Sequence, residues 1–108
     1  MIQEILALQT ICSHPNLVTL RHIIKQSLTN YPVLVFEFIE GTSDSELVQK
    51  LTVEDMRYFM YEAMKGLAFA HSRGIIHNDI KLSNILFDYK NRIVKIIDFG
   101  LSQFYVKG

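Results

Sequence analysis

The residues of this sequence best suited to chemistry lie in two short stretches, HNDIKLSN and DFG. Asp79 in the first stretch is a candidate to align an attacking hydroxyl group and take its proton, and Lys81 is placed to reach a γ-phosphate as a compact positive charge. Asn84 offers an amide oxygen and Asp98 a carboxylate, and both are hard ligands that suit Mg²⁺. Gly100 lets the backbone turn just past Asp98. Phosphoryl transfer is catalysed by positioning and by neutralising phosphate charge, so the pattern predicts this reaction.

Each of these residues taken alone has a simpler interpretation. An isolated Asp-Phe-Gly is typical of a turn, Asp79 and Lys81 are typical of solvated loop charges, and His77 beside Ile75 and Ile76 is typical of a core. The prediction depends on the two stretches occurring together, on a loop that follows a long amphipathic helix.

Composition narrows the class of protein. The 108 residues suffice for one small domain with a core, and 49% of them are hydrophobic, as in a globular chain. Eleven basic and eleven acidic side chains give a net charge of zero, which removes the electrostatic footprint of a nucleic-acid binder. Cys12 is the single cysteine and no Asn-x-Ser/Thr sequon occurs, so we expect a reducing compartment, the cytoplasm or nucleus. No apolar run approaches the roughly 20 residues that span a bilayer.

The first third of the chain predicts one helix and a β-hairpin. Apolar spacing indicates a helix over residues 2–12, and Pro15 disfavours helix just after it. Aliphatic and β-branched residues predict strands at 17–25 and 33–36, the second fully buried, in an antiparallel hairpin around a turn at 27–32.

The middle of the chain predicts a connector and two helices. Residues 37–43 form the connector, and a short helix follows at 45–51. Thr52 and Asp55 make an Asp variant of the capping box that begins a long helix, and Gly74 ends it. An apolar stripe at helical spacing along this helix is predicted to be core: Met56, Phe59, Met60, Ala63, Met64, Leu67, Ala68 and His71.

A second hairpin is predicted after the HNDIKLSN stretch. Residues 84–88 and 94–97 have the composition of strands, and the turn is 89–92. Such a hairpin would bring Asn84 and Asp98 together at its open end, as two ligands of one metal require. Together with the helices, the hairpins predict an α+β fold.

The sequence resembles the eukaryotic protein kinases over essentially its whole length. The stretches LVFEF, DMRYFMYE and HSRGI, in addition to the two chemical ones, are similar to the hinge and long helix of the catalytic subunit of casein kinase II. The resemblance implies part of a two-lobed kinase domain across residues 1–108. Residues 1–36 would belong to the small lobe, 37–43 to the hinge, and 44–108 to the start of the large lobe.

The resemblance also implies nucleotide-binding residues, with ATP and Mg²⁺ as cofactors. Glu4 would pair with a nucleotide-binding lysine, although a helix Glu is also typical of a solvated surface. Backbone groups of two hinge residues would meet adenine, and aliphatic side chains that are equally suited to an ordinary core would contact the purine. The set is Glu4, Phe36 as gatekeeper, Glu37, Ile39, Ser43 or Asp44 near the ribose, Leu86 and Ile97.

Substrate and partners follow from the same resemblance. Lys81, two residues after the catalytic Asp, is typical of the family's serine/threonine members. Protein substrates are therefore implied, and the casein kinase II likeness adds an acidic context and a possible regulatory subunit. Of the surface that such a subunit would contact, this chain has only the turn at 25–31, which is also typical of a solvated loop.

The chain departs from the family pattern in several ways. Asn78 stands where most kinases have an arginine that meets a phosphorylated activation segment, so we expect no switching by phosphorylation there. Leu82 stands where proline is usual. The sequence contains no glycine-rich loop and no strand with the phosphate-gripping lysine. We therefore expect a fragment or truncated product, marginally stable and melting below about 60 °C, with a catalytically inactive kinase-like binding module as the alternative.

Overall fold

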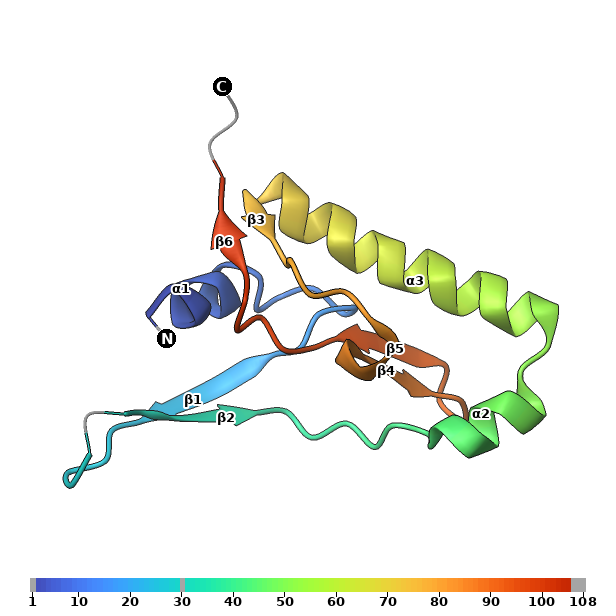
Figure 1. The fold of residues 1–108 in the computed structure, drawn as a ribbon, viewed down its shortest axis with the longest axis horizontal. Helices are drawn as coiled ribbons and strands as arrows, with labels where there is room; N and C mark the ends of the chain where they lie inside the picture. Colours follow the sequence, from blue (N-terminus) through green and yellow to red (C-terminus); the bar gives the residue numbers. More distant parts are fainter. Residues whose placement is uncertain (1, 30, 106–108) are drawn as a thin grey trace.

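The computed structural model describes residues 2–29 and 31–105 and has an α+β fold, as predicted. Three helices and three antiparallel two-stranded sheets make up this part of the chain (Figure 1). The long helix α3 runs along one side. The first hairpin and the connector at residues 37–43, which we call the hinge, run along the other (Figure 1). No helix among the described residues is long and apolar enough to cross a membrane.

The first helix and hairpin form at the predicted places. Helix α1 spans Ile2–Thr10, and β1 (Leu20–Ile24) pairs antiparallel with β2 (Val33–Phe36). The prediction that the second strand is fully buried is wrong, because Val33 is 38% and Phe36 is 36% exposed. The hairpin is a two-stranded sheet, so one of its faces has little to pack against. Asn30, in the predicted turn, lies outside the described residues.

The segment before β1 does not continue the hairpin as predicted. Its Val18 amide donates to the Ile96 carbonyl (3.0 Å), and the Ile96 amide donates to the Asn16 carbonyl (2.9 Å). We call residues 16–18 the crossing segment, because they precede β1 of the first hairpin but bond to β5 (Ile93–Ile96) of the second. Leu17 and Ile96 thereby form an isolated parallel bridge. Predicted strand 17–25 is therefore divided between two partners.

The crossing segment also packs closely on α3. A Cβ atom at Gly66 of that helix would lie 3.0 Å from the Asn16 carbonyl oxygen and 3.2 Å from Leu17 Cδ2. The side-chain amide of Asn16 donates to Glu62 Oε2 on α3 (2.9 Å) and to the Val94 carbonyl (3.0 Å). Only glycine leaves enough room for this approach of backbone to helix.

Two helices follow the connector. Helix α2 spans Asp44–Lys50, and α3 spans Val53–Ser72. The predicted capping box is confirmed, since Thr52 Oγ1 accepts from the Asp55 amide (3.1 Å) and Asp55 Oδ2 accepts from the Thr52 amide (3.1 Å). Gly74 has φ +81°, the left-handed conformation of a residue just past a helix.

The apolar stripe of α3 is only partly core. Phe59 and Ala63 are buried, as predicted, but Met56, Met60 and Met64 are 50%, 63% and 60% exposed. The stripe is wider than the arc of the helix that the β4–β5 hairpin and the crossing segment cover. The prediction of core packing is therefore wrong for the three methionines, and also for Ala68 and His71, which are exposed.

The second predicted hairpin is present and packs on α3. Strand β4 (Ile85–Asp88) pairs antiparallel with β5 (Ile93–Ile96), and a short 3₁₀ turn, η1 (Leu82–Asn84), leads into it. A third pair was not predicted, between β3 (Ile75–Ile76) and β6 (Gln103–Phe104). With two residues in each strand, these elements have no periodicity by which a sequence would reveal them.

Removing the Thr52 hydroxyl should destabilise the chain without altering its fold. We expect Thr52→Ala to lower the free energy of unfolding by about 1 kcal/mol, because the Asp55 amide loses its acceptor. Urea unfolding followed by circular dichroism measures this. Thr52→Ser keeps the acceptor and should stay close to the parent, so equal losses in both variants would contradict the capping role.

The chain should also lose stability in acid. Hydrogen bonds from the Thr52 backbone and from Arg92 lower the pKa of Asp55, and those from Asn91 lower the pKa of Asp88. A carboxyl whose pKa is lower in the folded state stabilises that state above its ordinary pKa of about 4, and this contribution is lost as the pH falls. The thermal midpoint should therefore drop between pH 6 and pH 3. A flat profile there would contradict this assignment.

Candidate functional site

His77 organises the loop that carries Asp79. The His77 ring is buried, its Nε2 lies 2.8 Å from the Ile97 carbonyl, and its Nδ1 accepts from the Asp79 amide (3.1 Å). The two contacts are compatible if Nε2 carries the proton and donates to Ile97. Phe99, also buried, meets the His77 ring edge to face with centroids 4.7 Å apart. The loop and the DFG stretch are thus tied together through the core.

Asn84 and Lys81 both lie against Asp79. The Asn84 amide donates to the Asp79 carbonyl oxygen (2.9 Å) and to its carboxylate Oδ2 (3.0 Å). Lys81 Nζ lies 3.7 Å from the other carboxylate oxygen, Oδ1, and the Lys81 side chain is 60% exposed. The carboxylate is therefore oriented from one side by a buried amide and faces an exposed positive charge on the other.

The β4–β5 hairpin places Asn84 and Asp98 at the same open end. The Ile97 amide donates to the Asn84 carbonyl (2.9 Å), and Asp98 follows directly. Asp98 has φ +59°, an uncommon conformation for a residue other than glycine and one often found at functional sites. Its Oδ1 accepts from the Gly100 amide (3.2 Å). The backbones of Asn84 and Asp98 are therefore close together, as the predicted hairpin requires.

The donor atoms at this end of the hairpin fit a divalent cation. The Asn84 amide nitrogen is used by Asp79, so its oxygen can face a metal, and Asp98 has a second carboxylate oxygen besides the one bonded to Gly100. In the described part of the chain, no three His, Cys, Asp or Glu residues are placed to hold a metal ion. A cation here would therefore complete its coordination with waters and with phosphate oxygens of a substrate, which is how Mg²⁺ is commonly held.

Glu4 lies on α1 beside the DFG stretch. Its Oε2 is 4.0 Å from the position that a Cβ atom on Gly100 would occupy. Among residues 2–29 and 31–105, Glu4 forms no ion pair with a lysine or arginine. The structure therefore places Glu4 near the predicted site and shows no partner for it within that part of the chain.

The hinge residues lie over the hairpin. A Cβ atom on Gly41 would be 3.2 Å from Leu86 Cδ2, so the hinge backbone passes directly above the Leu86 side chain. Ile97 is partly buried and packs on the main core, while Phe36 on β2 is 36% exposed. The Ile39 amide and the Glu37 carbonyl make no hydrogen bond within the described residues and are free to bind a ligand.

Ser43 and Asp44 have structural roles at the start of α2. Ser43 is the N-cap residue, and its hydroxyl accepts from the Glu46 amide at 3.4 Å. Asp44 is the first residue of the helix and adds negative charge to its first turn, where it is favourable. The capping contact engages the Ser43 oxygen that the family resemblance directs to a ribose.

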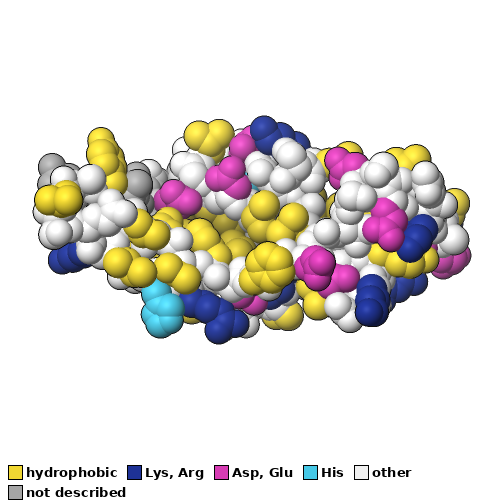
Figure 2. Space-filling model, turned by 90° about the horizontal axis from the view of Figure 1, so that it is seen from below, with side chains coloured by type: hydrophobic (Ala, Val, Ile, Leu, Met, Phe, Trp, Pro, Cys, Tyr) yellow, Lys and Arg dark blue, Asp and Glu magenta, His cyan; other side chains and the backbone are white. Residues whose placement is uncertain are grey.

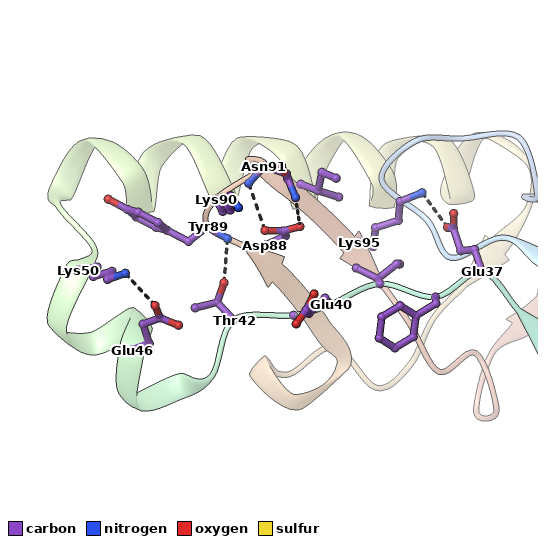
Figure 3. A pocket seen from close by; sticks show the side chains of 14 residues that line it. Glu37, Glu40, Thr42, Glu46, Lys50, Asp88, Tyr89, Lys90, Asn91 and Lys95 are labelled. Carbon is purple, nitrogen blue, oxygen red and sulfur yellow. Dashed lines mark hydrogen bonds and ion pairs between the residues drawn. The ribbon is translucent and has the colours of Figure 1, made fainter.

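Two contacts at the hinge were missed by sequence reasoning. Glu37 Oε1 pairs with Lys95 Nζ on β5 (2.8 Å), and the Thr42 hydroxyl accepts from the Tyr89 amide (2.9 Å). Both lie in a hollow of about 940 Å³ between the hinge, α2 and the hairpin turn (Figure 3). Lys95 lies 58 positions after Glu37, and no local pattern connects them.

Asn78 contacts the segment that follows Asp98. It has φ +70°, which asparagine tolerates, and its amide donates to the Leu101 carbonyl (3.2 Å). A neutral side chain therefore makes a backbone contact at the position where an arginine had been expected from the family pattern.

The face that carries β2 and the hinge combines apolar and acidic groups. Figure 2 shows apolar side chains gathered in a hollow near the middle of this face, with acidic side chains around them.

The sequence was compared with models of known protein families. The model described as "Protein kinase domain" matches residues 1–108, the whole length of the chain.

Proposed function

This chain belongs to the protein kinase family, and from that premise we propose that it transfers the γ-phosphoryl group of ATP to serine or threonine side chains of proteins. The observation that carries the proposal is the cluster at the open end of the β4–β5 hairpin. There Asn84 holds the Asp79 carboxylate, Lys81 lies beside it, and Asp98 follows the paired strand. Protein kinases use ATP with a divalent metal, and we propose Mg²⁺ for this chain.

Each residue has a defined task in the proposed reaction. The substrate hydroxyl oxygen attacks the γ-phosphorus and forms a new P–O bond, while the bond from the γ-phosphorus to the β–γ bridging oxygen breaks. Asp79 aligns the hydroxyl and accepts its proton, and Lys81 contacts the oxygens of the γ-phosphate. Asn84 and Asp98 would hold the metal, which supplies charge neutralisation at the phosphates.

The nucleotide base would bind at the hinge. The Glu37 carbonyl and the Ile39 amide are available for adenine, and Leu86 lies below the hinge backbone. Ile97 and Phe36 would complete an apolar surround. We propose these roles from the family pattern together with the positions of the residues.

Two finer proposals rest on the sequence. Lys81 favours serine and threonine over tyrosine, and the stretches LVFEF and DMRYFMYE favour a casein kinase II-like member with acidic substrates and a possible regulatory subunit. Phosphorylation of peptides with a Ser, Thr or Tyr acceptor, each made with acidic and with neutral flanking residues, tests both. Preference for the tyrosine peptide would overturn the first proposal, and indifference to acidic flanking residues the second.

A catalytically inactive binding module is the second candidate. The specific observation in its favour is that the Glu37 carbonyl and the Ile39 amide make no hydrogen bond within the described residues, so a base could bind at the hinge whether or not a phosphoryl group is transferred. This candidate predicts nucleotide binding without turnover, whereas the kinase predicts both.

Calorimetric titration with ATP, with and without Mg²⁺, tests the proposed site. We expect binding that strengthens with Mg²⁺ in the parent chain, and loss of the Mg²⁺ effect in Asp98→Asn. Glu54→Gln, which removes a carboxylate that is 84% exposed on α3, is the matched control and should behave as the parent. An Mg²⁺ effect that survives in Asp98→Asn would overturn the metal assignment, and absence of binding in all three would overturn the proposed function.

A further inference from the structure

Three contacts, made by Thr19 and Lys95, hold the side chain and backbone of Glu37, the first residue of the hinge. Its amide donates to the Thr19 carbonyl (3.0 Å), and its carboxylate Oε1 accepts from the Thr19 amide (3.1 Å). The same Oε1 pairs with Lys95 Nζ at 2.8 Å. Glu37 therefore connects the start of the first hairpin, the hinge and strand β5.

The Glu37–Lys95 pair is shielded from water. The Glu37 side chain is 17% exposed and that of Lys95 is 13% exposed. In every other ion pair of the described residues, the basic side chain is at least 43% exposed. Burial raises the pKa of Glu37, but the hydrogen bonds from Lys95 and Thr19 together lower it, so the carboxylate stays charged. Breaking a shielded pair is costly, because it leaves one charge away from water without a partner.

A second attachment holds the far end of the hinge. The Thr42 amide donates to the Phe87 carbonyl (2.6 Å), and the Thr42 hydroxyl accepts from the Tyr89 amide (2.9 Å). Figure 3 shows the two attachments apart from each other along the hinge, with Glu40 between them: Lys95 with Glu37 on one side and Thr42 with Tyr89 on the other. The hinge is thus fixed to the β4–β5 hairpin on both sides of the backbone groups that are free to bind a base.

Lys95 also lies beside the proposed floor of the base site. It is the cross-strand partner of Leu86, and directly opposed residues in an antiparallel pair project to the same face. The ion pair and the contact of Leu86 with the hinge therefore set the height of the hinge above one face of the hairpin.

We propose that Lys95, acting through Glu37, is a positioning residue that fixes the hinge backbone for recognition of the purine base. The proposal rests on the proposed function, since it concerns the base of the same nucleotide. Lys95 is not among the residues proposed to hold the phosphates or the metal. Its loss should therefore weaken binding of the base and leave binding of the phosphates alone unchanged.

Binding of adenosine, ATP and inorganic tripolyphosphate to matched variants tests this. We expect Lys95→Met to weaken adenosine and ATP by a similar factor, roughly tenfold or more, and to leave tripolyphosphate with Mg²⁺ unchanged. Lys95→Arg restores the pair and should recover most of the affinity. Lys90→Met is the control, because Lys90 lines the same hollow and forms no ion pair among the described residues. Adenosine affinity equal to that of the parent in Lys95→Met would overturn the proposal.

A double variant separates positioning from stability. Lys95→Met leaves the Glu37 charge shielded and unpaired, which destabilises the fold, whereas Glu37→Gln with Lys95→Met removes both charges and keeps an acceptor for Thr19. We expect the double variant to recover the thermal midpoint but not the adenosine affinity. Recovery of both would overturn the positioning role and leave the pair a purely structural one.

Hydrogen exchange at the hinge keeps the two proposals distinguishable. If the parent chain binds no adenosine, the proposed function fails. The exchange rate of the Glu37 amide then still tests whether Lys95 fixes the hinge backbone. We expect Lys95→Met to speed this exchange by about tenfold relative to Lys90→Met. An unchanged rate would overturn the inference by itself.

Discussion

Replacing Asp79 by asparagine is expected to lower kcat for phosphoryl transfer by roughly 10²–10⁴-fold, the usual contribution of a positioned general base. Asparagine keeps the shape of the side chain and an oxygen that can accept from the Asn84 amide. It has no carboxylate to take the proton of the attacking hydroxyl. The loss should therefore appear in the chemical step, with the affinity for ATP nearly unchanged.

Single-turnover phosphorylation of an acidic serine peptide, beside calorimetric ATP binding, separates these two quantities. Glu54→Gln serves again as the control, because it removes an equal charge from an exposed position. A fall in ATP affinity as large as the fall in rate would show that Asp79 acts in binding, and an unchanged rate would remove it from the mechanism.

Replacing Phe99 by alanine is expected to destabilise the chain by about 3–5 kcal/mol, the cost of deleting a buried aromatic ring. Phe99 is 1% exposed, meets the His77 ring, and belongs to the main core with Leu8, Leu17 and Ile96. For a small domain this is a large part of the total stability, so the variant should be mostly unfolded at 25 °C.

The control for Phe99→Ala is another phenylalanine of the same chain. Phe38 is 88% exposed, so Phe38→Ala should change the free energy of unfolding by no more than about 0.5 kcal/mol. Urea denaturation followed by far-ultraviolet circular dichroism measures both variants. Equal effects would mean that burial of the Phe99 ring does not contribute as its position implies.

Features that depend on near neighbours in the sequence were predictable. The capping box at Thr52 and Asp55, the end of α3 at Gly74 and the β4–β5 hairpin all depend on residues a few positions apart. The closeness of the Asn84 and Asp98 backbones followed from that hairpin, because its strands are short and its two ends are unambiguous.

Features that depend on distant partners were not predictable. Nothing in the sequence near Glu37 indicates Lys95, and the pairing of β3 with β6 involves too few residues to leave a periodic signal. The exposed edge of the α3 stripe was misjudged for a related reason, since the width of an apolar stripe does not reveal how much of it a neighbour covers. The left-handed conformation of Asp98 is likewise imposed by its surroundings.

The crossing segment has a consequence for how the chain acquires its structure during synthesis. Its Asn16 side chain bonds to partners 46 and 78 positions later, on α3 and on β5. A ribosome delivers residues in order, and contacts of such high sequence separation form slowly. We therefore expect α1 and the first hairpin to remain without these anchoring bonds until α3 and β5 have emerged, so a segment that is made earlier is secured only after segments that are made later.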